Sequence, residues 1–252
     1  DVVVNTSTEN YASWNWKAGG TASSNTDGTI TSSVSANTDA GFSIVSYTGT
    51  GSAATIGHGL SSAPEMVIVK NRDQTDAWQV GSSKGIDFTD YLVLNDSAGP
   101  TDNVDRWNDT APSASVFTIG DGVEVNTNTE DYIAYCFHSV DGYSKVGSYT
   151  GNGTDGDGNF LYCGFRPSYV LFKETSANNG WAIIDNKTNP YNLADQVLRA
   201  NISDETYSHS SGVDLLSNGI KLINNNGMWN DSGQTYIYLA IAESPFKTSN
   251  AR

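Results

Sequence analysis

The sequence is poor in basic residues. Among 252 residues, 13 Lys and Arg stand against 28 Asp and Glu, which gives a formal net charge of −15. Affinity for nucleic acid comes chiefly from cations that neutralise phosphates, so this balance argues against a nucleic-acid partner. The sequence also lacks a run of about 18 apolar residues, the length that a membrane-spanning helix needs. We therefore expect no membrane insertion.

Reactive side chains are equally scarce. Two cysteines, Cys136 and Cys163, are too few for a disulfide scaffold, and Cys136 lies in a strand-like run where a buried thiol is expected. His58, His138 and His209 lack the close spacing of a zinc site. There is no nucleophile elbow and no phosphate-binding loop, and no pair of acidic residues carries a glycosidase signature. We predict that the chain is no enzyme and needs no cofactor.

What the sequence does have in quantity is turn-forming and aromatic residues. Gly, Ser, Thr, Asn and Asp are abundant, a composition that favours short strands joined by tight turns. The 6 Trp, 13 Tyr and 8 Phe supply large apolar side chains, so the polar average does not indicate disorder. The composition predicts an all-β chain that folds around a substantial core.

The sequence contains two similar copies of a segment of about 100 residues. The matching pairs are "SYTGTG" (46–51) with "SYTGNG" (148–153), "PEMVIVK" (64–70) with "PSYVLFK" (167–173), "SVFTIGDGVEV" (115–125) with "GVDLLSNGIKL" (212–222), and "YIAYCF" (132–137) with "YIYLAI" (236–241). Nine residues run from Lys70 to Trp78 and again from Lys173 to Trp181. Such self-similarity predicts two copies of one structural unit.

The beginning of the chain resembles the end of a unit. "NTSTENY" (5–11) matches "NTNTEDY" (126–132), and "DVVV" before it matches "GVEV". We therefore expect residues 1–20 to be the terminal strands of an earlier repeat unit, so that the natural protein is longer at its amino end. Alternatively, this strand completes a sheet elsewhere in the same chain or in a neighbouring one. Residues 21–40 are rich in Ser, Thr and Gly and predict an extended linker.

Each unit contains about seven short apolar runs separated by turns. This pattern predicts two tandem antiparallel β-sandwich units, residues 41–141 and 142–252, the second with a carboxyl-terminal tail. Asp121-Gly122 and Asn218-Gly219 each lie between alternating runs and predict type I′ hairpin turns. Residues 132–137 are apolar on both faces, which indicates a central strand.

Several segments carry a family resemblance. "ASWNWKAGG" (12–20), "GFSIVSYTGTG" (41–51), "HGLSSAPEMVIVKNRD" (58–73) and the closing "YIYLAIAESPFKTSNAR" (236–252) are similar to a repeat in structural proteins of tailed bacteriophages, especially tail-fibre-like proteins of marine and cyanobacterial phages. The resemblance spans nearly the whole chain. It implies a virion component with an all-β repeat and no known catalysis, and it supplies no functional residues.

Positions alike in both copies are expected to serve the shared fold, Trp78 and Trp181 among them. Trp107 in "DRWND" and Trp229 in "GMWND" differ between the units and stand among polar residues. Each could stack on a sugar ring as a ligand-binding residue, or pack inward as a loop anchor.

An acidic loop offers a candidate metal site. "TGNGTDGDGNF" places Asp155, Asp157 and Asn159 at alternate positions, which is the start of a calcium-loop pattern. The bidentate Glu that closes such a loop is missing, and a plain acidic turn is the alternative.

We expect a virion structural protein, most simply a tail-fibre or related appendage module that acts in assembly and in host-surface attachment. Its partners would be other virion proteins, further copies of itself as a homo-oligomer with a trimer favoured, and a host-surface glycan. One rival is a carbohydrate-binding or adhesin module outside any virion. A glycan-degrading enzyme is the second rival.

Overall fold

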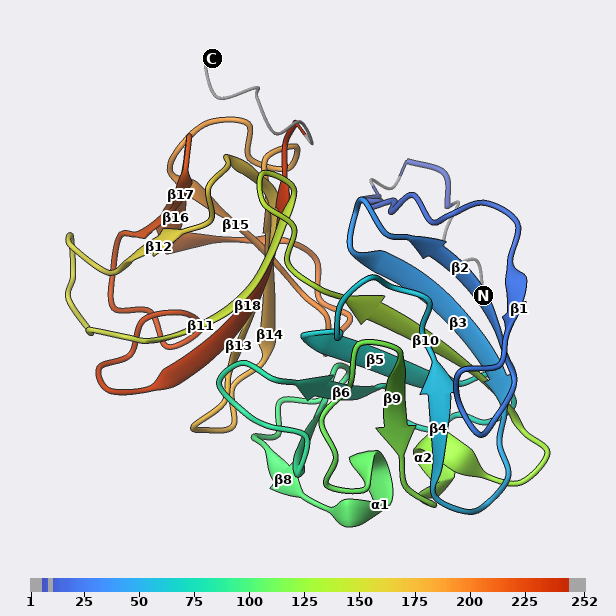
Figure 1. The fold of residues 1–252 in the computed structure, drawn as a ribbon. Helices are drawn as coiled ribbons and strands as arrows, with labels where there is room; N and C mark the ends of the chain where they lie inside the picture. The colour runs from blue at the N-terminus through green and yellow to red at the C-terminus, as the bar shows by residue number, and fades with distance from the viewer. Residues whose placement is uncertain (1–5, 9–10, 245–252) are drawn as a thin grey trace.

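The computed structural model describes residues 6–8 and 11–244, and nearly all regular structure in them is β-strand (Figure 1). The strands are β1 (Ser23–Asn25), β2 (Ser32–Asn37), β3 (Phe42–Thr48), β4 (Ala54–Gly57), β5 (Met66–Asn71), β6 (Gln79–Ser82), β7 (Asp90–Val93), β8 (Thr101–Asp102), β9 (Val116–Ile119), β10 (Asp131–Phe137), β11 (Ser144–Thr150), β12 (Phe160–Tyr162), β13 (Pro167–Glu174), β14 (Trp181–Asp185), β15 (Ala194–Arg199), β16 (Tyr207–Leu216), β17 (Gly219–Leu222) and β18 (Thr235–Ala242). Two helices of four residues, α1 (Val104–Trp107) and α2 (Val123–Asn126), complete the described elements. No helix in this part of the chain is long and apolar enough to cross a membrane.

Each repeat unit is built on one eight-stranded antiparallel sheet. The order in unit 1 is β1-β2-β3-β10-β5-β6-β7-β8, and in unit 2 it is β11-β18-β13-β14-β15-β16-β17-β12. The strands that match in sequence occupy matching places, because β3-β10-β5-β6 corresponds to β11-β18-β13-β14. The predicted all-β class is confirmed.

Two packed sheets per unit, as a sandwich requires, are not confirmed. The strands of unit 2 form a single sheet, and its two edge strands β11 and β12 both contribute to one pocket, with Lys145 on one side and Tyr162 on the other. The sheet therefore curves towards closure on itself. In unit 1, β4 and β9 form a separate two-stranded sheet.

Three apolar layers hold the molecule together. One lies inside each unit, and a third lies between the two eight-stranded sheets. Central strand β10 serves two of these layers: Ala134 and Cys136 enter the core of unit 1, whereas Tyr135 and Phe137 enter the layer between the units. This confirms the prediction that residues 132–137 form a central strand. Both cysteines are buried and unpaired.

The predicted linker is part of the fold. Residues 21–40 contribute β1, which is the edge strand of the unit 1 sheet, and β2, which pairs with both β1 and β3. Val34 and Ile30 are buried in the core of unit 1, and the Ile30 N–H donates to the carbonyl of Thr55 on β4 (3.1 Å). Small Ser and Thr side chains suit an edge strand with one solvated face, which is why composition alone suggested a linker.

The two predicted hairpins have different outcomes. Strands β16 and β17 form a hairpin with Leu216 opposite Gly219, but neither Asn218 nor Gly219 has the positive φ of a type I′ turn. Asp121-Gly122 forms no hairpin, because Gly122 is the N-cap of α2 with φ −60°. Asn126 and Asn230 each donate to the carbonyl six residues earlier. Residues 116–126 of unit 1 are therefore structurally equivalent to residues 220–230 of unit 2, and not to residues 212–222. The sequence alignment of these segments was therefore shifted.

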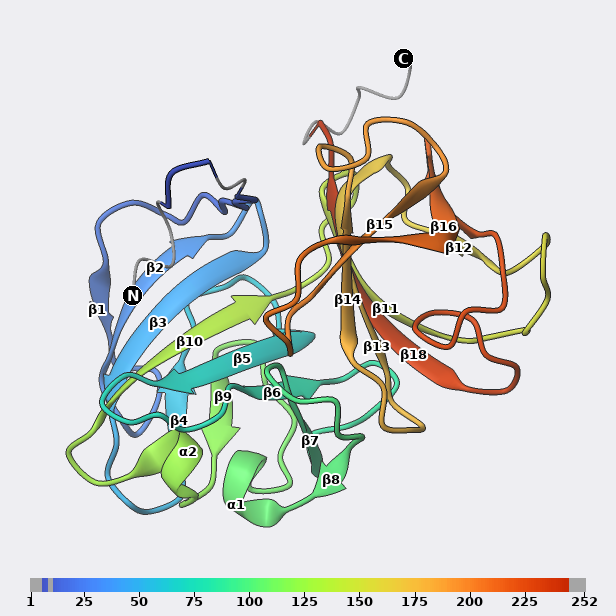
Figure 2. The same cartoon turned by 180° about the vertical axis from the view of Figure 1, so that it is seen from behind.

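The amino-terminal segment packs on both units without forming a strand in residues 6–8 and 11–20. Figure 2 shows it running beside β1 and β2, where Asn37 Nδ2 donates to the carbonyl of Lys17 (3.0 Å). Trp14 and Trp16 reach the layer between the units, with ring centroids 5.6 and 5.4 Å from that of Tyr169. The predicted terminal strands are thus not formed in these residues, and residues 1–5 and 9–10 lie outside those described.

Candidate functional site

The most strongly repeated cluster of side chains is a pair of stacked tyrosines in each unit. Tyr47 stacks on Tyr132 with ring centroids 5.3 Å apart, and Tyr149 stacks on Tyr236 at 5.2 Å. The two pairs are also alike in tilt, with interplanar angles of 12° and 14°. Each stack joins the "SYTG" strand to the last strand of its unit.

The hydroxyl of the second tyrosine holds the turn before it. Tyr132 Oη accepts from the N–H of Thr127 (2.8 Å) and donates to the carbonyl of Val123 (2.6 Å). Tyr236 Oη does the same with the N–H of Asp231 (3.0 Å) and the carbonyl of Gly227 (2.9 Å). These bonds satisfy backbone groups that the irregular turn would otherwise leave unpaired.

A buried asparagine completes the cluster in each unit. Asn126 Oδ1 accepts from the N–H of Thr50 (2.8 Å), and Asn230 Oδ1 accepts from the N–H of Asn152 (3.0 Å). Sequence reasoning missed both, although Asn ends "GVEVN" and "GMWN" alike. We call this tyrosine pair with its asparagine the turn lock. Its polar atoms bond to the backbone of their own unit, so its chemistry is that of a structural clamp.

The two candidate sugar-stacking residues are core residues. Trp107 and Trp229 are fully buried in the cores of units 1 and 2, so neither offers a ring face to a ligand. Trp229 stands where unit 1 has Val125, since Tyr149 Oη donates to the carbonyl of Trp229 (2.6 Å) as Tyr47 Oη does to that of Val125 (2.8 Å). The alternative, a loop anchor packed inward, is what the structure shows.

Two of the three candidate calcium ligands, Asp157 and Asn159, are engaged in other contacts. The Asp157 carboxylate pairs with Lys221 Nζ (2.5 Å), and the Asn159 side chain bonds the N–H of Asn152 (3.1 Å) and the carbonyl of Thr150 (2.9 Å). Asp155 is exposed in the same loop. Within the described residues, no group of three or more His, Cys, Asp and Glu side chains is arranged to hold a metal ion.

The shared tryptophans differ in depth. Trp181 is buried in the layer between the units, and its Nε1 donates to the carbonyl of Val93 in unit 1 (2.8 Å). Trp78 is only half-buried and stacks on Tyr135 with centroids 6.3 Å apart. The prediction of a core position therefore holds fully for Trp181 alone.

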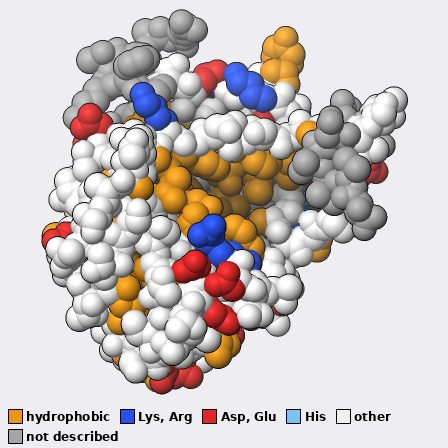
Figure 3. All heavy atoms as spheres, turned by 90° about the vertical axis from the view of Figure 1, so that its right-hand side faces the viewer, with side chains coloured by type: hydrophobic (Ala, Val, Ile, Leu, Met, Phe, Trp, Pro, Cys, Tyr) orange, Lys and Arg blue, Asp and Glu red, His pale blue; other side chains and the backbone are white. Residues whose placement is uncertain are grey.

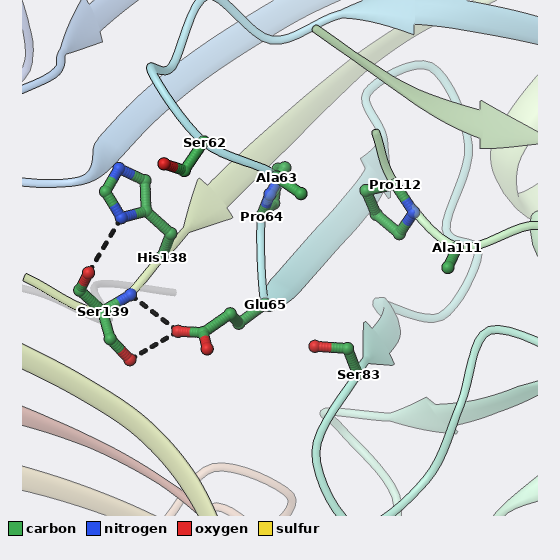
Figure 4. A pocket seen from close by; sticks show the side chains of 9 residues that line it. All are labelled: Ser62, Ala63, Pro64, Glu65, Ser83, Ala111, Pro112, His138 and Ser139. Carbon is green, nitrogen blue, oxygen red and sulfur yellow. Dashed lines mark hydrogen bonds between the residues drawn. The ribbon is translucent and has the colours of Figure 1, made fainter. Parts of the chain in front are cut away.

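A pocket of about 430 Å³, lined by both polar and apolar side chains, lies where unit 1 passes into unit 2 (Figure 4). Glu65, the residue before β5, turns its carboxylate towards Ser139 in the segment that joins the units. Glu65 Oε2 accepts from the N–H of Ser139 (2.7 Å) and from its hydroxyl, while Oε1 pairs with Lys84 (2.9 Å). Burial alone would raise the pKa of Glu65, but these partners outweigh it and lower the pKa below the ordinary 4.5.

This arrangement does not activate a nucleophile. The Ser139 hydroxyl points to Glu65 rather than to His138, whose Nδ1 lies 2.9 Å from the carbonyl of Ser139 (Figure 4). A hydroxyl needs a free base within hydrogen-bond reach to become a nucleophile. The thiols offer no alternative, because burial raises the pKa of Cys136 and Cys163 to about 12. The contacts of Glu65 with Ser139 and Lys84 act as a clamp that fixes the segment joining the two units.

One face of the molecule carries an apolar hollow. Figure 3 shows hydrophobic side chains gathered there, with Lys, Arg, Asp and Glu side chains at its lower margin. Apolar surface collected in a hollow is typical of contact with another protein or a ligand.

Comparison with known proteins gives one match. No curated protein and no solved structure matches the chain. A family model described as a domain of unknown function (DUF7483) matches residues 1–245, so that both units and the amino-terminal segment fall within one family domain. The chain therefore belongs to the DUF7483 family.

Proposed function

We propose that the chain is a structural component of a tailed-bacteriophage particle, a tail-fibre or related appendage module that acts by assembly. On this proposal it resides in the virion, contacts other virion proteins and forms a homo-oligomer, with a trimer favoured. Attachment to a host-surface glycan is a second role that such a module would have. The proposal of a phage particle rests on the family resemblance of the repeats. The proposal that the chain acts by assembly rests on the site described above.

The turn lock carries this proposal. Its two copies match in ring geometry and in hydrogen bonds, and their polar atoms are engaged with the backbone of their own unit. The clamp at Glu65 likewise joins one segment of the chain to another. Side chains that are committed in this way stabilise a rigid module. The apolar hollow supports a role in contact with other proteins.

Quantitative mass spectrometry of purified particles tests the proposal. We expect the chain at a constant copy number relative to the major particle proteins in independent preparations. Its absence from particles would contradict a virion role. An isolated monomer that binds glycan would then favour the carbohydrate-binding or adhesin module, and release of reducing ends from host polysaccharide would favour the enzyme.

A further inference from the structure

The amino-terminal segment contains a third copy of the turn from the turn lock. The N–H of Thr6 donates to Tyr11 Oη (2.9 Å), five residues later. The same bond, over the same separation, joins Thr127 to Tyr132 (2.8 Å) and Asp231 to Tyr236 (3.0 Å). The sequence match between 5–11 and 126–132 therefore corresponds to a shared conformation.

The backbone supports the same conclusion. Thr8 has φ 74°, Thr129 has φ 69°, and Gly233 at the matching place has φ 77°. A positive φ at a β-branched residue is uncommon, so its recurrence at Thr8 and Thr129 marks one particular turn.

The third copy lacks the partner that the other two have. Tyr132 and Tyr236 are fully buried beneath Tyr47 and Tyr149, whereas Tyr11 is 51% exposed. Among the described residues no ring stacks on Tyr11. The turn is therefore formed, and the aromatic ring that would cover it is missing.

The residues after Tyr11 divide between two faces as in β10. Trp14 and Trp16 pack in the layer between the units, as do their counterparts Tyr135 and Phe137. On the other face, Ser13 and Asn15 are exposed where β10 has Ala134 and Cys136 in its core. Asn15 Nδ2 donates to Ser13 Oγ (3.1 Å), so a covering sheet would meet two polar side chains that are bonded to each other.

We infer that residues 6–8 and 11–16 stand in the place of the last turn and strand of a third unit, and that a repeat unit lacking its own last strand completes this third unit. This repeat unit is the partner. Its "SYTG" strand would pair antiparallel with residues 11–16 and place its tyrosine on Tyr11, as β3 and β10 pair Tyr47 with Tyr132. Pairing of this kind adds main-chain hydrogen bonds along a strand, and the alternate side chains give specificity.

This inference deepens the proposed assembly role and rests on it. A second intact copy of the chain does not fit as the partner, because its Tyr47 and Tyr149 are already stacked within their own units. The partner must therefore offer an unpaired "SYTG" strand.

A fused chain tests the inference. Residues 142–225 are placed directly before Asp1, so that the residues 1–16 that follow take the place of 226–241 as the last turn and strand of the added unit. Unit 2 is a better source of the added residues than unit 1. Its "SYTG" strand β11 is an edge strand, so no neighbouring strand equivalent to β2 has to be added as well. The measurements are hydrogen exchange at residues 11–16, nitration of Tyr11, and limited proteolysis of the added residues. Tyr11→Ala in the same fused chain is the matched variant, and Tyr191→Ala, at an exposed tyrosine of unit 2, is the control.

We expect the added residues to resist proteolysis and Tyr11 to lose its reactivity. Exchange at residues 11–16 should slow by at least about tenfold relative to the unfused chain. Tyr11→Ala should abolish all three changes, and Tyr191→Ala should leave them in place. Added residues that are digested as readily in every version would overturn the inference, and so would equal protection with and without Tyr11. These readouts do not depend on the presence of the chain in particles, so the proposed function can fail separately.

Discussion

At the scale of single residues, repetition predicted structure better than local surroundings did. Tyr47, Tyr149 and Trp181 recur in sequence and are buried or packed on the cores, as expected. For Trp107 and Trp229 the sequence left two alternatives open, because polar neighbours do not show which way the ring between them points, and both rings are buried. In both cases the ring lies in the core, and next to Trp229 the polar Asn230 is buried as well.

The buried position of Trp229 predicts a large loss of stability on truncation. Trp229→Ala should lower the free energy of unfolding by about 3 to 5 kcal/mol, because it removes a fully buried indole and leaves a cavity. Trp78→Ala, at a half-buried ring, should cost clearly less. Chemical denaturation of both variants provides the measurement. Equal losses for the two would contradict the assignment of Trp229 to the core.

The buried ammonium of Lys173 predicts a pH dependence. Its Nζ donates to the carbonyls of Ser97 (3.2 Å), Glu174 (2.9 Å) and Asn179 (2.6 Å), and burial lowers the pKa of Lys173 to about 8. Between pH 8 and the ordinary value of 10.5 the unfolded chain binds this proton more tightly than the folded chain. The contribution of Lys173 to stability therefore rises with pH across that window.

Comparison with Lys173→Met isolates this effect. The stability of the wild type relative to the variant should increase from pH 8 to pH 10.5 in denaturation curves taken at each pH. Lys70→Met, at the matching position of unit 1, is the control for the general effect of replacing a lysine by methionine at this position of a unit. A difference that falls with pH would show that the sign is wrong.

At the scale of elements, strands with apolar residues on one or both faces were predictable, and elements built from polar residues were not. β5, β10, β13 and β18 follow directly from their apolar runs. β2 was missed because its three Ser residues carry little hydrophobic signal, and the segment becomes a strand by pairing with β3. The helix α2 was missed because Asp-Gly also favours a hairpin, and only tertiary contacts decide between the two.

At the shared turn, introducing glycine in unit 1 and removing glycine in unit 2 should change the free energy of unfolding differently. Thr129 has φ 69°, so Thr129→Gly should leave stability unchanged or raise it by up to about 1 kcal/mol. Gly233 has φ 77° with nothing within 4 Å of an added Cβ, so Gly233→Ala should cost about 1 kcal/mol through the backbone alone. Thermal unfolding of the two variants measures both effects. Destabilisation by Thr129→Gly that exceeds that of Gly233→Ala would refute the equivalence.

At the scale of the whole molecule, the layer between the sheets joins the two units into one body. Apolar residues on both faces of 132–137 indicated that this strand is covered twice, but nothing in the sequence identified unit 2 as the second cover. Trp181, which bonds to Val93, and the clamp of Glu65 on Ser139 fix the joint. Glu65 has no counterpart in unit 2, where Ser168 takes its place, so repetition could not reveal the clamp.

The clamp predicts a stability that depends on acid. Glu65→Gln loses the ion pair with Lys84 and should lower the free energy of unfolding by about 1 kcal/mol at neutral pH. The folded pKa of Glu65 lies below its ordinary 4.5, so the contribution is present above pH 4.5 and is lost as the pH falls through the folded value. Wild type and variant should therefore converge in acid. Glu243→Gln, which breaks the more exposed pair with Arg166 in unit 2, is the control, and a gap that widens in acid would contradict the clamp.

The claim that the chain works by assembly is tested most directly by sedimentation equilibrium of the full chain, with residues 1–20 present, over a wide range of concentrations. Edge strands such as β11 and β12 present unpaired backbone groups that association can cover. The account predicts a closed homo-oligomer, with the mass of a trimer favoured. A single species with the mass of the monomer, 26.9 kDa, up to the highest concentration would contradict it.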